Sequence, residues 1–132
     1  MTQTGSALAT APRRGVILLG HGSRDPLWRA PLEAVLACIQ QQQPQLACCC
    51  AYLELTAPSL EEAADRLIAQ GVAQLRITPM FLGTGKHARE DIPRLVAALR
   101  ARHPGVAVDV QASVGEDARV TALLARIATE QP

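Results

Sequence analysis

The sequence is poor in aromatic residues, in excess charge and in long hydrophobic runs. Trp28, Tyr52 and Phe81 are the only aromatic residues among 132, so any large core has to be aliphatic. The formal net charge is +1, which gives no electrostatic footprint for nucleic acid or for an anionic membrane. No apolar run approaches the roughly 20 residues that a membrane-spanning helix needs. We therefore expect no nucleic acid and no membrane among the partners.

The cysteines contain no C-x-x-C pair of the kind that binds metals or carries out redox chemistry. They are Cys38 and the consecutive Cys48, Cys49 and Cys50. Side chains of consecutive strand residues point to alternate faces, so three adjacent thiols cannot converge on one metal ion. We expect all four to be small buried residues of a protein in the reducing cytoplasm.

Residues 1–14 are rich in Ser, Thr and Ala and end in Arg13 and Arg14. They lack the apolar segment of a secretory signal, so we expect a disordered tail, with a transit peptide as the alternative. Residues 15–132 are long enough for one domain with a substantial core. Neither a linker nor an internal repeat divides them, which favours a single compact unit.

Residues 15–132 alternate between strand-like and helix-like segments. Short apolar runs predict strands over residues 16–19, 46–55, 74–81 and 106–111. Apolar residues at helical spacing follow each strand, and the first helix is expected over 27–42. The second starts with a capping box of Ser59 and Glu62 and stops at Gly71. The other two helices carry the stripes Ile92, Leu95, Val96, Leu99 and Val120, Leu123, Leu124, Ile127.

Four strand–helix units with short connections predict an α/β fold, an open parallel four-stranded sheet with helices on both faces. Ligands of such sheets bind at the carboxyl ends of the strands. The pattern places these residues there: His21, Ser23, Arg24, Glu54, the loop 83–87 that ends in His87, Ser113 and Gly115. The glycines on either side of His21 let its backbone approach a ligand closely. His103 falls at a helix C-terminus, where a cation suits the helix dipole, and we expect a structural role.

Two histidines at one edge of a sheet suit either a divalent metal ion or base catalysis near neutral pH. His21 also has simpler alternatives, since it could cap the following helix or bond a backbone carbonyl. Gly20 and Gly22 do not complete a dinucleotide fingerprint, because Asp25 stands where the third glycine belongs. The sequence has no G-x-x-x-x-G-K-[ST] loop either, so nucleotide-dependent chemistry is not expected.

Three segments in order resemble the small class II tetrapyrrole chelatases: GHGSRD at 20–25, YLELTAPSLEEA at 52–63 and GKHAREDIP at 85–93. The resemblance runs from Gly15 to Ile127 and is specific because the three segments occur together at strand ends. It implies ATP-independent insertion of a divalent metal into sirohydrochlorin, cobalt favoured, with iron or nickel as alternatives. By position, His21 and His87 match the family's metal-site histidines, and Glu54 matches an acidic residue near that site. Long members hold two such units, so this chain is expected to form a homodimer with the site in the inter-subunit cleft.

Metal insertion displaces two pyrrole protons, which suggests roles for the candidate residues. His21 and His87 would hold the ion by few bonds and leave positions open for the macrocycle nitrogens. An imidazole or Glu54 would accept the protons. Substrate contacts are expected from Ser23, Arg24, Gly85, Lys86 and Arg89, the cations docking carboxylates and the others shaping the loops. For Arg89, an ordinary solvated charge is the favoured interpretation. A non-catalytic metal- or tetrapyrrole-binding protein and a phosphate-ester hydrolase with His21 as base are the alternatives outside this class.

Overall fold

The computed structural model describes residues 12–132, which build a four-stranded sheet in the order β2-β1-β3-β4. The strands are β1 (Arg13–Gly20), β2 (Ala47–Tyr52), β3 (Val72–Pro79) and β4 (Ala107–Val110). Each neighbouring pair is parallel, so all four carboxyl ends lie at one edge of the sheet. The predicted fold class is confirmed.

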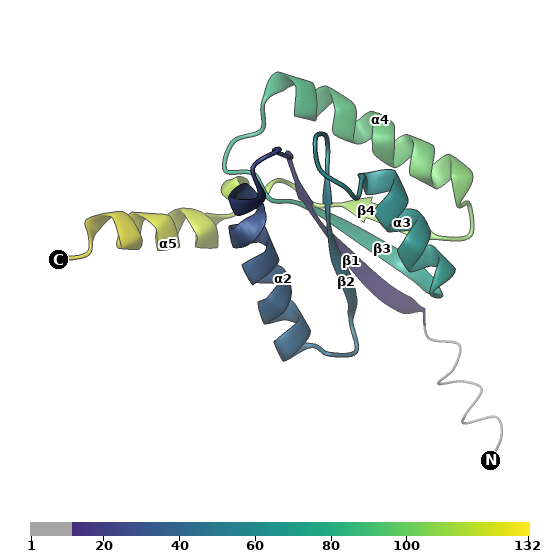
Figure 1. The fold of residues 1–132 in the computed structure, drawn as a ribbon, viewed down its shortest axis with the longest axis horizontal. Coiled ribbons are helices and arrows are strands. Elements are labelled where there is room, and N and C mark those ends of the chain that lie inside the picture. Colours follow the sequence, from purple (N-terminus) through teal and green to yellow (C-terminus); the bar gives the residue numbers. More distant parts are fainter. Residues whose placement is uncertain (1–11) are drawn as a thin grey trace, which may run out of the picture.

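Helices lie unevenly on the two faces of this sheet (Figure 1). They are α2 (Ala30–Gln42), α3 (Leu60–Ala69), α4 (Lys86–Arg102) and α5 (Ala118–Thr129). Two short 3-10 turns, η1 (Pro26–Arg29) and η2 (Val114–Glu116), precede α2 and α5. In Figure 1, α3 and α4 cover one face, α2 lies on the other, and α5 projects away from the body. The half of the second face formed by β3 and β4 is therefore not covered by α5.

The core is aliphatic and lies mainly between the sheet and the pair α3 and α4. Ile17 and Leu19 of β1 and Ile77 of β3 are fully buried there, together with the inner faces of both helices. Leu18, between the two β1 residues in sequence, packs in a smaller cluster with residues of α2. This alternation is the two-residue period of a strand that is covered on both faces.

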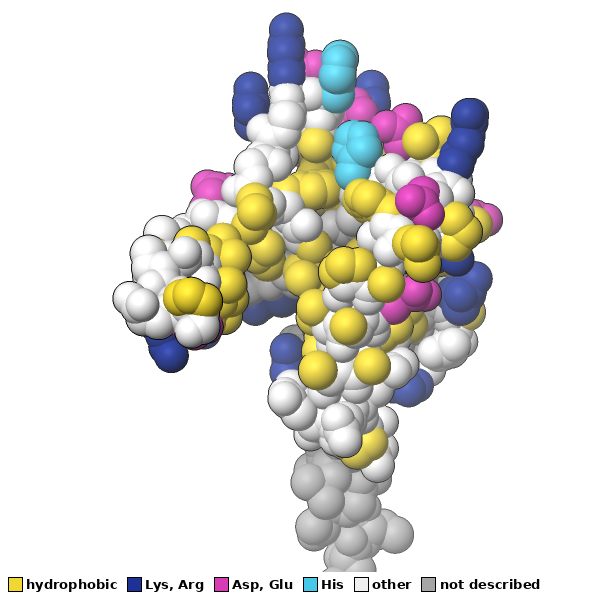
Figure 2. Space-filling model, turned by 60° about the vertical axis from the view of Figure 1, so that its left-hand side comes forward, with side chains coloured by type: hydrophobic (Ala, Val, Ile, Leu, Met, Phe, Trp, Pro, Cys, Tyr) yellow, Lys and Arg dark blue, Asp and Glu magenta, His cyan; other side chains and the backbone are white. Residues whose placement is uncertain are grey.

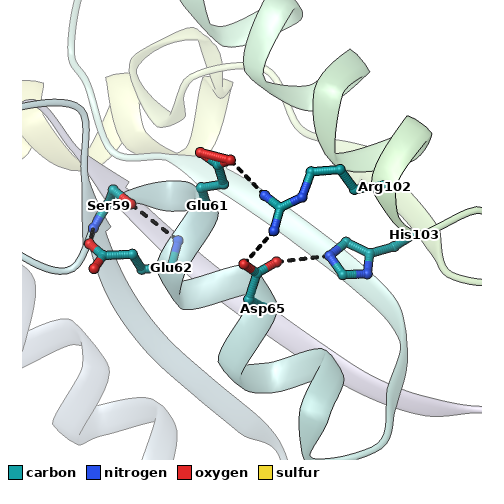
Figure 3. A network of polar contacts seen from close by, with 6 residues as sticks. All are labelled: Ser59, Glu61, Glu62, Asp65, Arg102 and His103. Atoms are coloured by element: carbon teal, nitrogen blue, oxygen red, sulfur yellow. Dashed lines mark hydrogen bonds and ion pairs between the residues drawn. The ribbon is translucent and has the colours of Figure 1, made fainter.

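A polar network ties α3 to the C-terminal end of α4 (Figure 3). The Arg102 guanidinium donates to Glu61 at 2.6 Å and to Asp65 at 2.5 Å. His103, the C-cap of α4, places Nε2 2.8 Å from the other Asp65 oxygen. These contacts, with His103 first and Arg102 second, hold the pKa of Asp65 below its ordinary value. The predicted capping box of Ser59 and Glu62 is confirmed, with both hydrogen bonds present.

Several predicted boundaries are wrong. The expected tail over 1–14 does not reach residue 14, because β1 begins at Arg13; residues 1–11 lie outside the described part. The helix expected over 27–42 is split into η1 and α2. Pro31 has no amide hydrogen to donate to the Leu27 carbonyl, so a helix running through Leu27 would be broken there. The α-helix instead begins at Ala30, which places Pro31 in the first turn, where no such donor is needed.

The cysteines are free, and only Cys50 is buried as expected. Cys48 and Cys49 are half-buried, and Cys38 is exposed on α2. Burial is the largest cause that raises the pKa of Cys48 and of Cys50 to about 11, which keeps both thiols protonated. Among the described residues, no helix combines the length and apolar character needed to cross a membrane.

Candidate functional site

The His21 side chain lies just beyond the carboxyl end of β1 and contacts a carboxylate. Its Nε2 lies 2.8 Å from Oε1 of Glu54, and both side chains are about half exposed, 52% and 54%. Phe81, which follows β3, meets the imidazole edge to face, with ring centroids 6.5 Å apart and planes at 72°. The ring is thus fixed by a polar contact on one side and an aromatic contact on another. Asp25, not His21, is the cap of η1, and in the described part of the chain the His21 ring bonds no backbone carbonyl.

Backbone hydrogen bonds hold the two loops that carry His21 and Glu54 together. The amide of Leu53 donates to the Gly20 carbonyl at 3.0 Å, and the amide of Glu54 donates to the His21 carbonyl at 3.0 Å. Gly22 adopts a φ of +113°, and a Cβ built there would lie 1.7 Å from the carbonyl oxygen of Glu54. Any larger residue at position 22 would push the loops apart, so glycine is required by both conformation and space.

The segment after Glu54 adds a third connection between these loops, which the sequence analysis did not identify. Leu55 adopts a φ of +65°, the left-handed region that costs a leucine roughly 1–2 kcal/mol. The hydroxyl of Thr56 donates to the carbonyl of Ser23 across the loops. Thr56 follows Glu54 by two positions in the YLELTAPSLEEA segment, and that proximity was the only signal available in the sequence.

His87 reaches the same edge from the other side of β1, on the first turn of α4, and is exposed. The loop that delivers it is anchored to η2 and the residues beside it. The Thr84 and buried Ser113 hydroxyls lie 2.5 Å apart, and the Gly115 amide donates to the Phe81 carbonyl at 2.9 Å. A Cβ at Gly115 would lie 1.8 Å from the Leu82 carbonyl oxygen. Ser113 and Gly115, expected at this edge, thus serve to position the loop.

The predicted substrate-contacting residues divide into two groups. Arg24 and Lys86 are exposed and take part in no ion pair among residues 12–132. Arg89 instead donates from Nη1 to the Thr84 carbonyl at 2.8 Å, a contact that steadies the loop. The Ser23 hydroxyl accepts from the Asp25 amide at 3.1 Å. Gly85 is the N-cap of α4 and supplies no side-chain cap, so the first amides of α4 have no side-chain partner there.

The topology therefore gathers the predicted candidates at one edge and pairs two of them directly. His21 and Glu54 are in contact, and His87 lies at the same edge and, within residues 12–132, makes no hydrogen bond or ion pair with either. Figure 2 shows two histidine side chains near each other at one end of the molecule, with apolar side chains below and basic ones close by. Within residues 12–132, no three His, Cys, Asp or Glu side chains gather in a way that could hold a metal ion.

A parallel α/β sheet with histidines and a carboxylate on its carboxyl edge defines a class of protein that binds small ligands or metal ions at that edge. A family model narrows the class. The model of the CbiX family matches residues 15–131, and this chain belongs to the CbiX family.

Relatives with known names agree with this assignment. The chain is 35% identical over 85 residues to the sirohydrochlorin cobaltochelatase of Methanothermobacter thermautotrophicus. The aligned region covers 64% of this chain and 59% of that protein. It is 28% identical over 112 residues to the sirohydrochlorin ferrochelatase of Bacillus subtilis, and this aligned region covers 82% of this chain and 41% of that protein. The chain therefore spans about three fifths or less of these relatives' length.

Two solved structures share the fold. A CbiX protein of cobalamin biosynthesis from Marinobacter aquaeolei is 32% identical with a TM-score of 0.76, over 87% of this chain and 93% of that one. The sirohydrochlorin chelatase SirB from Bacillus subtilis subspecies spizizenii, in complex with cobalt, is 26% identical with a TM-score of 0.73. That match covers 88% of this chain and only 50% of SirB.

Proposed function

We propose that this protein inserts a divalent metal ion, cobalt favoured, into a sirohydrochlorin-type tetrapyrrole without ATP. Membership of the CbiX family and the names of its relatives support the reaction. The observation that carries the proposal is the pair of His21 and Glu54, 2.8 Å apart at the carboxyl edge that also bears His87. The exposure of these side chains suits a metal that is a substrate and has to leave.

Glu54 orients His21 for metal binding. A carboxylate that accepts a hydrogen bond from one ring nitrogen fixes the tautomer and leaves the other nitrogen with a free lone pair. With Nε2–H donating to Glu54, the free lone pair of His21 is on Nδ1. We propose that this nitrogen and the imidazole of His87 hold the incoming ion by two bonds. The remaining positions of the ion then stay open for the nitrogens of the macrocycle.

Insertion also requires a base, because two pyrrole protons leave as the metal enters. The half-exposed carboxylate of Glu54 and the imidazoles are the candidate acceptors at this edge. A positioned base of this kind contributes about 10²- to 10⁴-fold to a rate. Since Glu54 already bonds His21, protonation of Glu54 would loosen that imidazole and so couple proton uptake to metal release.

We assign the docking of the substrate carboxylates to exposed cations that form no ion pair within residues 12–132. Arg24 and Lys86 are exposed; Arg24 follows His21 by three positions, and Lys86 directly precedes His87. The amides of the first α4 turn, without a side-chain cap, add partial positive charge beside Lys86. Arg89 has a smaller direct role in this proposal, because its guanidinium bonds the Thr84 carbonyl. Ser23 and Gly85 contribute by shaping the loops.

We further propose that the protein is a cytoplasmic homodimer with the site in the cleft between subunits. The match to SirB, in which this chain covers half of the longer protein, supports a second unit facing the first. The four free cysteines support a reducing compartment.

Iron is the second candidate metal, because one curated relative is a sirohydrochlorin ferrochelatase. A side-by-side assay with Co²⁺, Fe²⁺ and Ni²⁺ tests both proposals. The absorbance of sirohydrochlorin should change faster with protein than without it, and fastest with Co²⁺. Preference for another ion would change the metal assignment. Binding of the pigment without acceleration would indicate a carrier, and indifference to the pigment would favour a hydrolase.

His87→Ala should lower the insertion rate by about 100-fold or more, because it removes one of two metal ligands and leaves the helix intact. His103→Gln is the matched control, since His103 lies at the other end of α4 and contacts Asp65. Full activity of His87→Ala would remove this residue from the mechanism. Equal losses in both variants would show that the effect is structural.

A further inference from the structure

The edge that carries the candidate site also carries three very exposed leucines. Leu27, Leu55 and Leu82 are 80%, 54% and 68% exposed, more than any other large apolar side chain described outside α5. Leu27 lies in η1 after β1, Leu55 follows β2, and Leu82 follows β3. Since β2, β1 and β3 are neighbours in the sheet, the three segments start from adjacent strand ends. We refer to these three residues as the leucine rim.

Leu55 is the central residue of a γ-turn. The Thr56 amide donates to the Glu54 carbonyl at 2.8 Å, and Leu55 between them has a φ of +65°. This form of the turn is rare and strained, because the Cβ of an L-residue crowds the backbone in the left-handed region. Glycine or asparagine adopts such a φ at lower cost. The backbone of the turn therefore gives no reason for a leucine.

The fold makes no use of the Leu55 side chain either, since it belongs to neither apolar cluster of the described residues. Polar contacts hold the turn instead. The Glu54 amide donates to the His21 carbonyl at 3.0 Å, and the Thr56 hydroxyl donates to the Ser23 carbonyl. Strained residues persist where their surroundings fix them in this way, and they cluster at ligand-binding sites. The turn thus presents an apolar side chain to solvent beside the candidate site.

Leu82 is held in a comparable way beside the other contact of His21. Phe81 places its ring against the His21 imidazole, and Leu82 is the next residue. The Gly115 amide donates to the Phe81 carbonyl at 2.9 Å, and Gly115 leaves no room for a Cβ next to the Leu82 carbonyl. Glu54 and Phe81, which both contact His21, are therefore each followed by an exposed leucine whose backbone is fixed.

The surroundings of the leucine rim indicate a ligand with an apolar face and an anionic periphery. The exposed cations Arg24 and Lys86 belong to the segments after β1 and β3, which also carry Leu27 and Leu82. Figure 2 shows apolar side chains beside two histidines and basic side chains nearby. A ligand gains most here if it covers the leucines and presents carboxylates to the cations. A tetrapyrrole with carboxylate side chains has this chemistry, because its flat ring is apolar and its charges lie outside the ring.

We propose that the leucine rim, and Leu55 in particular, binds the flat face of the tetrapyrrole ring. Contacts from the segments after three neighbouring strands hold the ring over the His21 imidazole, while Arg24 and Lys86 take its carboxylates. The leucines act on the ring and not on the metal ion, because a leucine side chain has no atom that can coordinate an ion. This inference deepens the proposed function and rests on it.

Leu55→Asn separates binding of the ring from folding, because asparagine accepts the left-handed backbone but offers no apolar side chain. The dissociation constant for metal-free sirohydrochlorin, and the KM for this pigment, should rise about tenfold. The affinity for Co²⁺ without pigment should stay unchanged, since His21 and Glu54 keep their contact. The denaturant midpoint should be unchanged or higher, because the strain at position 55 is relieved. Absorbance titrations with pigment, cobalt binding and denaturant unfolding measure these effects.

Leu55→Met is the matched control, since methionine keeps an apolar side chain of similar volume and should bind the pigment within about twofold of wild type. Wild-type affinity of Leu55→Asn would overturn the inference. So would a lower denaturant midpoint of Leu55→Asn, because the leucine would then pack within the fold. A loss of pigment affinity that appears only as sedimentation shows copies of the chain separating would also overturn it. A wild-type protein that neither binds nor metallates the pigment would refute the proposed function itself, whereas an active wild type with an unaffected Leu55→Asn would refute this inference alone.

Discussion

At the scale of single residues, Gly22 decides how closely the His21 and Glu54 loops approach. Its φ of +113° and the 1.7 Å between a would-be Cβ and the Glu54 carbonyl oxygen leave room for hydrogen alone. The 2.8 Å contact of the two side chains therefore depends on a residue that has no side chain. The same logic applies at Gly115, which supports the loop that leads to His87.

Gly22→Ala should destabilise the protein by about 1–3 kcal/mol, because the new methyl group meets backbone and the φ is strained. Denaturant unfolding measures this change. Gly83→Ala is the control, since Gly83 has nothing within 4 Å of an added Cβ and no positive φ. Equal stability of the two variants would contradict the close approach. We also expect Gly22→Ala, unlike Gly83→Ala, to lower cobalt affinity, because Glu54 would no longer reach His21.

At the scale of secondary-structure elements, the first turn of α5 depends on one carboxylate. The Asp117 carboxylate caps α5 by accepting from the Arg119 amide at 2.8 Å, and it also pairs with the Arg119 side chain. The side-chain hydrogen bond from Arg119 is the largest cause that lowers the pKa of Asp117 to about 2. Since the pKa is lower in the folded state, the cap stabilises α5 above pH 4 and loses its effect as the pH falls toward 2.

We therefore expect the helical signal of the protein to fall between about pH 4 and pH 2 in part because α5 frays at its first turn. Circular dichroism of the wild-type protein and of Asp117→Asn measures this contribution. The variant keeps a capping amide oxygen but cannot titrate, so its signal should change less over this range. Identical acid profiles would show that Asp117 does not hold the start of α5.

At the scale of the whole molecule, the sequence predicts the architecture well because its signals are local. Apolar runs, helical stripes and the Ser59 and Glu62 capping box are read within a few residues, and the parallel sheet follows from their order. The carboxyl-edge rule then places His21, Glu54 and His87 correctly at one edge. The family resemblance adds the roles of these residues, which spacing alone does not give.

The rest depends on contacts between segments far apart in the chain. Periodicity identifies the apolar stripe of α5 but not the surface on which that stripe packs. The prediction of helices on both faces of the sheet therefore did not include a helix that projects away from it, as α5 does. The pairing of His21 with Glu54, and of Thr84 with Ser113, joins loops about 30 residues apart and has no local signal. The apolar stripe around Pro31 predicts one continuous helix, whereas the missing amide hydrogen of Pro31 favours a helix that begins just before it, as α2 does.

The most direct test of the proposed site is whether one divalent ion contacts His21 and His87 together. The chain has three histidines, so imidazole resonances of ¹⁵N-labelled protein can be followed individually during a Co²⁺ titration. We predict that the His21 and His87 rings shift or broaden in parallel up to a single saturation point, while His103, bonded to Asp65, is unaffected. Saturation of the two rings at different metal concentrations, or a response of only one of them, would contradict the shared site.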